Sequence, residues 1–279
     1  MIDRRQLLLG MGGAAAGIGG LPALGASGLD LSDRDDFVTA CVKMRGSLDD
    51  RLCIGWVMGR RYAVPDHKAI PMMRLMAATL TQYRRIRPDA FEAKSLEVAY
   101  FMDIDTGKLL ETWKNPVTGK VVDVPRTRMG PSRFILTADG LELQVAAGEA
   151  RGLELNHHFD PAVIRGDDVY ITEVIGVDSE PQNGRKPFVY NEMSTYHAKM
   201  SDLADPAQAT VPTNVSFNGL VTYRPWMGFA DTPGHTIAHG SGGRAASIDE
   251  LPRYWRELTK KYNPDVLEDP LAALAGDPE

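Results

Sequence analysis

One turn occurs twice in the sequence, and its spacing constrains the fold more than any other feature. Thr106-Gly107-Lys108 returns twelve positions later as Thr118-Gly119-Lys120, within YFMDIDTGKLLETWKNPVTGKVVDV at residues 100–124. In each copy the glycine supplies the positive φ that a tight reversal needs, and a preceding Asp, Thr or Asn can cap the amides of the loop. Strands of about five residues with a turn about every twelve residues are typical of an antiparallel meander. We therefore predict consecutive antiparallel strands in this region.

The same alternation of apolar and polar residues covers most of the chain. We expect further strands at residues 52–64, 72–86, 133–146, 167–178, 186–198, 213–225 and 234–240. The segment at residues 72–86 is rich in methionine and is also compatible with a helix, and Asn183-Gly184 predicts a hairpin turn. Because about nine short strands without intervening helices must bury one apolar face, the sheet has to close or fold over. We predict a mainly β fold, a large antiparallel meander that closes into a barrel or half-barrel with room for a ligand.

Amphipathic helices are expected on both sides of the strands. Ser32 is placed as an N-cap, Asp35 completes a capping box three residues later, and Gly46 ends this first helix. The segment at residues 248–262 carries its apolar side chains on one helical face. We therefore predict an N-terminal and a C-terminal helix, both packed on the barrel.

The first 27 residues resemble a twin-arginine export signal. Arg4 and Arg5 precede a mild apolar stretch rich in Gly and Ala, followed by small residues at which a signal peptidase could cut. The alternative is a buried or flexible N-terminus that contains two arginines by chance. We expect residues 1–27 to engage the twin-arginine export machinery, so that the mature chain is periplasmic. Residues 28–264 then form a single domain, and residues 265–279 are expected to be a flexible tail.

Charge and hydropathy argue against two classes of partner. The formal net charge is −6 and the sequence pI is about 5.6, so the chain has no basic footprint for nucleic acid. No window holds the roughly 20 consecutive apolar residues of a membrane span. The two cysteines, Cys41 and Cys53, either pair in an oxidising compartment or are buried as free thiols, because their spacing does not decide between these alternatives. The sequence carries no signal for an oligomeric state.

Neither a metal site nor a cofactor site has a signature in this sequence. On an unbroken strand, His235 and His239 share one face but lie about 13 Å apart, too far for one metal ion. The adjacent His157 and His158 point to opposite faces. The glycine-rich turns lack the strand-to-helix exit of a phosphate loop. We therefore expect no metal and no cofactor, and the alternative is a metal site assembled from distant strands.

The strand expected at residues 186–198 carries the best candidates for catalysis. Tyr190, Glu192, Ser194 and Tyr196 alternate onto one face of it. If this face lines the barrel, desolvation among aromatic rings raises the pKa of Glu192 towards the range of a general base. Tyr190 or Tyr196 would then return or polarise a proton. The alternative is an outer face with ordinary solvated polar groups.

Other candidates lie near the expected ends of strands. His239 is a candidate general acid or a structural hydrogen-bonding group. Trp226 and Met227 either form a stacking wall for an aromatic ligand or plug the end of the barrel. Arg60 or Arg61 is expected to hold an anionic group of the ligand.

Two further acids, Glu97 and Glu173, are embedded in apolar strand patterns. We interpret both as structural, because a buried carboxylate needs a partner and arginines such as Arg60, Arg61 or Arg74 are available. This interpretation leaves Glu192 as the acid assigned to catalysis.

The order of these segments is similar to that of a known protein family. Four stretches, EVAYFMDIDTGKLLETWKNPVTGKVVDV, YNEMSTYHA, YRPWMGFADTPGHTIAHGSGGR and ELPRYW, resemble the bacterial family called domain of unknown function 1838. The resemblance extends from about Asp30 to Pro264, which is most of the mature chain. It is in keeping with export, since many members look exported by twin-arginine signals. It implies no catalytic residue, because the family carries no settled catalytic assignment.

These features support two hypotheses about function. The first, which we prefer, is a cofactor-independent lyase or isomerase that uses acid–base catalysis on a small apolar, aromatic (phenolic) compound. The second is a lipocalin-like exported protein that binds a small hydrophobic ligand without changing it. An enzyme needs two or more ionisable groups at one point of its pocket, whereas a carrier needs a mostly apolar lining. An acyl-transfer enzyme is not expected, because neither Ser241 nor Ser247 lies in the GxSxG frame of a nucleophile elbow.

Overall fold

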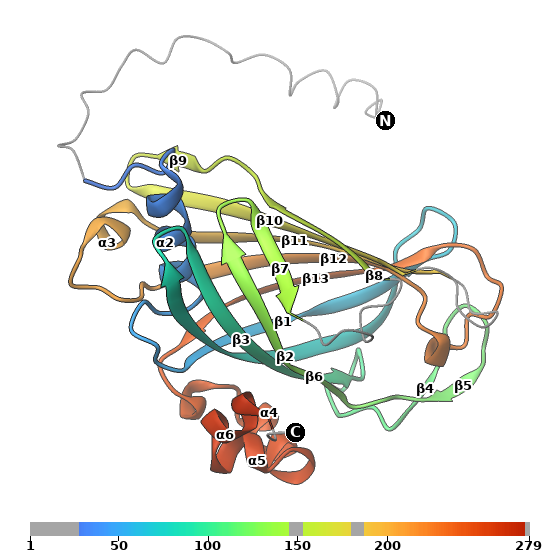
Figure 1. The fold of residues 1–279 in the computed structure, drawn as a ribbon. Coiled ribbons are helices and arrows are strands. Elements are labelled where there is room, and N and C mark those ends of the chain that lie inside the picture. Colours follow the sequence, from blue (N-terminus) through green and yellow to red (C-terminus); the bar gives the residue numbers. More distant parts are fainter. Residues whose placement is uncertain (1–27, 145–152, 180–186, 277–279) are drawn as a thin grey trace, which may run out of the picture.

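The computed structural model describes residues 28–144, 153–179 and 187–276, and a large antiparallel sheet dominates it (Figure 1). The sheet has eleven strands and is nearly closed into a barrel, with a few helices in the N- and C-terminal regions. The predicted mainly β fold is therefore confirmed. The expected signal at residues 1–27 and the expected turn at Asn183-Gly184 lie outside the described residues.

One long-range pairing joins the two halves of the barrel wall. The strands are β1 (Cys53–Val64), β2 (Ile70–Arg87), β3 (Ala90–Met102), β6 (Thr127–Thr137), β7 (Gly140–Gln144), β8 (Leu153–Phe159), β9 (Val163–Arg165), β10 (Asp168–Ser179), β11 (Phe188–Lys199), β12 (Asn214–Thr222) and β13 (His235–Ala245), with the short helix α3 (Met200–Ala204) after β11. Their order across the sheet is β7-β6-β3-β2-β1-β13-β12-β11-β10-β8, and β9 pairs with β10. The last strand, β13, thus lies between β12 and the first strand, β1.

The methionine-rich segment at residues 72–86, compatible in sequence with a strand or a helix, is a strand. It forms most of β2, where Leu75 and Thr79 face the interior of the barrel while Met76 and Leu80 pack against the C-terminal helices outside. Because both faces of β2 are covered, its apolar residues do not alternate clearly with polar ones.

The two edge strands of the sheet, β7 and β8, meet through a side chain. The backbone N–H of Leu141 donates to Nδ1 of His157 over 3.0 Å. The other ring nitrogen, Nε2, lies 2.6 Å from Oε1 of Glu173 on β10. Because Nδ1 accepts a hydrogen bond, Nε2 carries the proton and donates it to the carboxylate. His157, which belongs to β8, therefore connects the two edge strands of the sheet, β7 and β8.

Helix α2 (Arg34–Arg45) packs against one end of the barrel. Its apolar side chains, from Phe37 to Met44, are buried in one cluster with residues of several strands, and Met44 also lines the interior. The expected helix is therefore confirmed, but the predicted N-cap, Ser32, lies one residue before the actual one. Asp33 is the N-cap and accepts hydrogen bonds from the first backbone N–H groups at 2.9 and 3.1 Å, whereas the Ser32 hydroxyl donates to Asp30.

The C-terminal helices cover the outer face of β2 and β3. They are α4 (Arg253–Tyr262), α5 (Asp265–Glu268) and α6 (Pro270–Ala275), preceded by the 3₁₀ turn η2 (Ile248–Glu250). Trp255 is fully buried there, and its indole N–H donates to the carbonyl of Val98 over 3.0 Å. The expected flexible tail at residues 265–279 is wrong as far as residue 276. Val266 and Leu274 are buried in the same cluster as Trp255, because α5 and α6 turn their apolar residues towards the sheet.

The repeated turn is built twice with the same hydrogen bonds. In each copy the residue five positions before the lysine, Asp103 or Asn115, accepts from the N–H groups of the threonine and the glycine. The distances are 2.7 and 3.0 Å in the first copy, and 3.0 and 2.9 Å in the second. Gly107 and Gly119 have φ values of 68° and 73°, a region that favours glycine. The predicted scaffold role of the two turns is therefore confirmed.

The second copy of the turn supports one rim of the barrel. It joins β4 (Thr112–Lys114) and β5 (Val121–Asp123), which form a separate two-stranded sheet. The amide of Asn115 donates to the carbonyl of Met227 over 2.8 Å, at the end of the 3₁₀ turn η1 (Pro225–Met227). The hydroxyl of Thr118 donates to the next carbonyl, that of Gly228, over 3.1 Å. The hairpin thus fixes the loop that carries Trp226.

Two smaller features bear on the sequence expectations. Cys41 and Cys53 are free and buried, and burial raises the pKa of both thiols. The structure therefore agrees with the alternative in which the two cysteines are buried as free thiols and pack like small apolar residues. Among the described residues, the longest helices are too short and too polar to reach across a bilayer.

Candidate functional site

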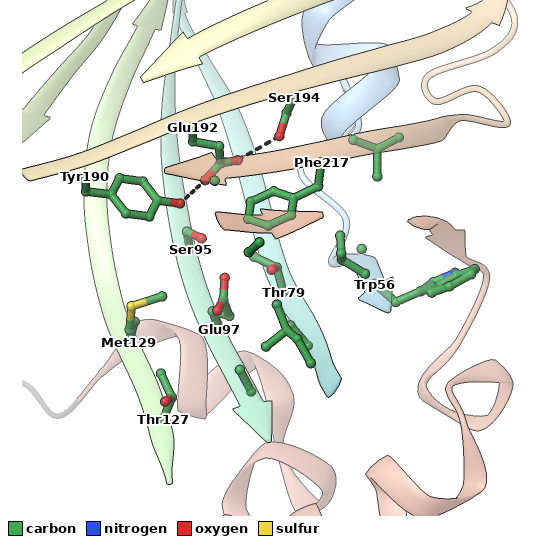
Figure 2. Close-up of a pocket in the computed structure, with 18 of the residues that line it drawn as sticks. Trp56, Thr79, Ser95, Glu97, Thr127, Met129, Tyr190, Glu192, Ser194 and Phe217 are labelled. Carbon is green, nitrogen blue, oxygen red and sulfur yellow. Dashed lines mark hydrogen bonds between the residues drawn. The ribbon is translucent and has the colours of Figure 1, made fainter. Parts of the chain in front are cut away.

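The barrel encloses a cavity of about 840 Å³. Side chains from β1, β2, β3, β6, β10, β11, β12 and β13 line it, together with residues of η1 and the end of α2. Figure 2 shows lining residues of β1, β2, β3, β6, β11 and β12. Apolar and aromatic residues form the larger part of the lining, and charged side chains interrupt it, among them two glutamates and six arginines. A cavity of this size that combines apolar walls with convergent polar groups is typical of a site for a small molecule.

The face of β11 that the sequence singled out lies inside the barrel. Tyr190, Glu192, Ser194 and Tyr196 all line the cavity. The intervening Met193 points the other way and is 42% exposed. Because successive side chains of a strand point to opposite faces, the even-numbered residues of β11 face the cavity and the odd-numbered ones face outwards.

Glu192 is held by two hydroxyl donors on its own strand. The Ser194 hydroxyl donates to one carboxylate oxygen over 2.7 Å, and the Tyr190 hydroxyl donates to the other (Figure 2). Burial raises the pKa of Glu192, and these two hydrogen bonds partly oppose that rise because they favour the ionised form. Burial and the charge of Glu192 together raise the pKa of Tyr190 well above its usual value, so the phenol stays protonated.

Glu97, on β3, reaches into the same space (Figure 2). Burial raises the pKa of Glu97 to about 7; the charge of Glu192 adds to the rise and Arg61 opposes it. Within the described ranges, the Glu97 carboxylate has no hydrogen-bond donor or ion-pair partner, unlike Glu192. Near neutral pH it is therefore present in both protonation states, which is the condition that suits proton transfer.

Of the six arginines that line the cavity, Arg61 and Arg224 lie next to aromatic rings and form no ion pair among the described residues. The guanidinium of Arg61 lies 5.4 Å from the ring centre of Phe101, and that of Arg224 lies 4.3 Å from the ring centre of Phe188. Burial lowers the pKa of Arg61 to about 10, with a further contribution from the charge of Arg224. Burial also lowers the pKa of Arg224. Both side chains remain cationic at neutral pH.

Four predicted site residues lie elsewhere or belong to other contacts. His239 is exposed on the outer face, where its Nδ1 lies 2.8 Å from Oδ1 of Asn218, while its neighbour Ala238 lines the cavity. Glu192 and His239 are thus on opposite sides of the wall, and the expected pairing of these two residues is wrong. Arg60 pairs with His239 across the sheet and is exposed as well, because successive side chains of a strand point to opposite faces and its neighbour Arg61 points inwards. It therefore cannot reach a ligand inside the barrel.

The other two corrections concern the rim and one tyrosine. Met227 is completely buried in a core cluster and does not line the cavity, whereas Trp226 does. Tyr196 lines the cavity, but its hydroxyl donates to Glu173 over 3.3 Å and not to Glu192. Of the predicted residues, the structure thus brings Tyr190, Glu192, Tyr196, Arg61 and Trp226 together at one cavity.

Glu173 forms a second buried acidic site with a complete set of partners. Arg45 on α2 lies 2.5 Å from it, His157 lies 2.6 Å from it, and Tyr196 donates to its second oxygen. Burial alone would raise the pKa of Glu173, but Arg45, His157 and Tyr196 outweigh that cost and lower it. The expectation that Glu173 is structural agrees with these contacts, although its arginine is Arg45 and not one of the three named from the sequence.

Two cavity residues escaped the sequence analysis. Glu97 was interpreted as structural, although it alternates with Ala99 and Phe101, which also line the cavity. Arg224 was not singled out, because it follows the end of β12 and only the path of η1 brings it over the cavity. The part of the chain that the structure describes contains no group of three or more His, Cys, Asp or Glu side chains able to hold a metal ion.

Comparison with known proteins gives one match. The model of the family described as "Protein of unknown function (DUF1838)" matches residues 50–144 and 180–275, which together make up more than half of the chain. These segments include β1 to β3 and β11 to β13, and therefore most of the cavity wall. No curated protein and no solved structure matches the chain.

Proposed function

The chain belongs to the DUF1838 family, and we propose that it is an enzyme that transfers protons on a small, largely apolar and aromatic molecule inside its barrel. The observation that carries the proposal is the pair of unequal acids, Glu97 and Glu192, at one cavity. One of them has two hydroxyl donors and the other has none within the described residues. Two acids in different environments can take different roles in one reaction.

The different surroundings assign the roles. Glu192, whose ionised form accepts hydrogen bonds from Tyr190 and Ser194, is the base that removes a proton from carbon. Glu97, which lacks such donors and has a pKa of about 7, is the acid that returns a proton to another atom of the same molecule. For an isomerase the two transfers balance. For a lyase, the proton from Glu97 goes to the leaving group, and a double bond forms where the proton was lost.

The aromatic lining limits the kind of molecule that fits. Phe101, Phe217 and Trp226 face the cavity, so a planar ring can pack against them. Removing a proton next to a ring leaves a negative charge that the ring delocalises, which makes such a carbon acid accessible to a carboxylate base. We therefore propose a lyase or isomerase acting on an aromatic compound, and a phenolic compound fits this scheme.

The proposal is tested by following deuterium. The full chain, purified after export, is incubated in D₂O with a small-molecule extract, and compounds that gain deuterium or change mass are identified by mass spectrometry. Glu97→Gln and Glu192→Gln should each lower the rate at which the compound gains deuterium or changes mass by about 10²-fold or more, as expected for an acid–base residue. Glu92→Gln is the matched control, because Glu92 is on the same strand as Glu97 but pairs with Arg84 outside the cavity. A change that persists in both cavity variants would refute the assignment.

A second function, binding without catalysis, is favoured by one observation. Most of the cavity lining is apolar, as in a lipocalin-like carrier. A carrier retains its ligand unchanged, so native mass spectrometry would find a bound compound with the same mass before and after incubation in D₂O. Glu97→Gln would then leave the amount of retained ligand unchanged or increase it.

We also propose that the protein is exported to the periplasm, on the basis of Arg4 and Arg5 alone. The test is a reporter protein fused behind residues 1–27. Export should be lost with Arg4→Lys/Arg5→Lys, and a reporter that stays in the cytoplasm with the natural sequence would overturn this proposal.

A further inference from the structure

Arg61 and Arg224 both line the cavity, beside one cluster of aromatic rings. The ring next to Arg61, that of Phe101, contacts Trp226, which follows Arg224 by two residues. Aromatic side chains surround them: Phe101 contacts Arg61, Phe188 contacts Arg224, and the ring of Trp226 lies 5.7 Å from that of Phe101. Two like charges among apolar rings are unfavourable unless an anion compensates for them.

The two arginines lack the partners that other buried arginines of this chain have. Arg45 pairs with Glu173, and Arg244 donates to the backbone carbonyls of Lys43 and Gly46 at the end of α2. For Arg61, by contrast, Nε is buried without any hydrogen-bond partner. Across the described ranges, neither Arg61 nor Arg224 has a carboxylate within 4.0 Å. The remaining charged groups that act on Arg61 are Glu97 and Arg224, and Glu97 forms no ion pair with it.

We propose that Arg61 and Arg224 form a binding site for a carboxylate of the substrate, so that the substrate is an aromatic acid. This inference rests on the proposed function, because it names the class of molecule on which the two glutamates act. The guanidinium group presents its donors in a planar fork that matches the two oxygens of a carboxylate. The flanking rings leave space for the apolar part of the same molecule, held against Phe101 and Trp226.

The strand register relates Arg61 to Glu192. Arg61 pairs with Ala238, Ala238 with Gly219, and Gly219 with Glu192, so Arg61 and Glu192 stand at the same level of the wall, three strands apart. Adjacent strands are about 4.8 Å apart, which leaves room between the two side chains for part of a bound molecule. A carboxylate held by Arg61 therefore lies across the cavity wall from the acid that we propose as the base.

The experiment compares acids with their amides on the full chain. Benzoate, 2-naphthoate and 4-biphenylcarboxylate are each titrated against the matching amide, and binding is followed by calorimetry. Each amide keeps the shape of its acid and removes only the charge. We expect at least one acid to bind on the order of tenfold or more tightly than its amide, since a charge-assisted hydrogen bond contributes about 1.5–3 kcal/mol. Arg61→Gln and Arg224→Gln should each bring the ratio of the two affinities, acid over amide, close to one.

The matched control is Arg60→Gln, because Arg60 is the neighbouring arginine of the same strand and lies on the outer face. It should leave the preference for the acid unchanged, and Arg61→Lys should restore part of it. If acids and amides bind equally and Arg61→Gln changes neither, the carboxylate site is refuted while the cavity keeps its proposed function. If none of the six compounds binds, both proposals fail. Circular dichroism of each variant shows whether the fold is retained.

Discussion

Glu173 and Glu97 are both glutamates with side chains in the interior of one barrel, and their pKa values are shifted in opposite directions. Glu173 has Arg45, His157 and Tyr196 as partners, which lower its pKa against the cost of burial. Glu97 is partly buried and has no donors among the described residues, and its pKa rises to about 7. The more deeply buried acid thus has the lowered pKa, because its partners outweigh the cost of burial.

The difference separates a structural region from a region available for chemistry. The partners of Glu173 come from α2, β8 and β11, so its carboxylate helps to join three elements. Glu97 connects no elements, and its partial burial is an unfavourable contribution to the free energy of folding when it is ionised. Groups with such perturbed pKa values in a cavity are candidates for function. The following predictions test this contrast, in order of decreasing effect.

The largest effect is expected for Glu173→Gln. The variant leaves Arg45 buried without a compensating charge, since its side chain is only 14% exposed. Breaking a buried ion pair in this way costs about 3–5 kcal/mol. Urea denaturation at pH 7 should therefore show a free energy of unfolding lower by about that amount. A loss below about 1 kcal/mol would mean that the Glu173 cluster is not structural.

Glu97→Gln should stabilise the protein at high pH. The folded pKa of about 7 lies above the ordinary value of 4.5, so the folded state binds the proton more tightly than the unfolded state. Stability therefore falls as the pH rises from about 4.5 to 7, by roughly 3 kcal/mol in total, and is constant above that range. The glutamine variant lacks this decline. Unfolding curves of both proteins at pH 5 and pH 8 measure it, and equal slopes with pH would contradict the raised pKa.

Tyr190→Phe should have an intermediate effect. It removes the phenol that donates to Glu192, so the pKa of Glu192 rises further, because one of the two hydrogen bonds that favour the ionised form is lost. The carboxylate stretch in difference infrared spectra, recorded from pH 4 to pH 9, reports this titration. Tyr170→Phe is the control, because Tyr170 is 38% exposed on β10 and should leave the spectrum unchanged. An unaltered midpoint in Tyr190→Phe would remove the tyrosine from the site.

The smallest effect is expected for His239→Ala. His239 is exposed and bonds only to Asn218 among the described residues, so its loss should change the free energy of unfolding by less than about 0.5 kcal/mol. Ligand retention, followed by native mass spectrometry, should not change either. A variant that loses its ligand would return His239 to the site and would contradict the orientation of β13.

The alternation of residues on β11 was enough to predict the grouping of Tyr190 with Glu192. The sequence could not say which face of a strand is inside, because helices cover part of the outer wall and make it apolar as well. For this reason His239 and Arg60, whose side chains point outwards, were assigned to the site. Glu97 could be located on its strand but not interpreted, since its lack of partners depends on side chains from other strands. The two short helices after residue 264 lack the length at which a helical pattern becomes recognisable.

The pairing of β13 with β1 has a consequence for the way this protein comes into being. Ile54 lies opposite Ala245, so the wall joins residues roughly 190 positions apart. Contacts that distant in sequence form slowly, because a long loop must close before they can stabilise anything. A nascent chain cannot close the wall until its last strand has left the ribosome, and until then β1 has an unpaired edge. The wall therefore closes only after β13 has emerged, and not as each strand is made.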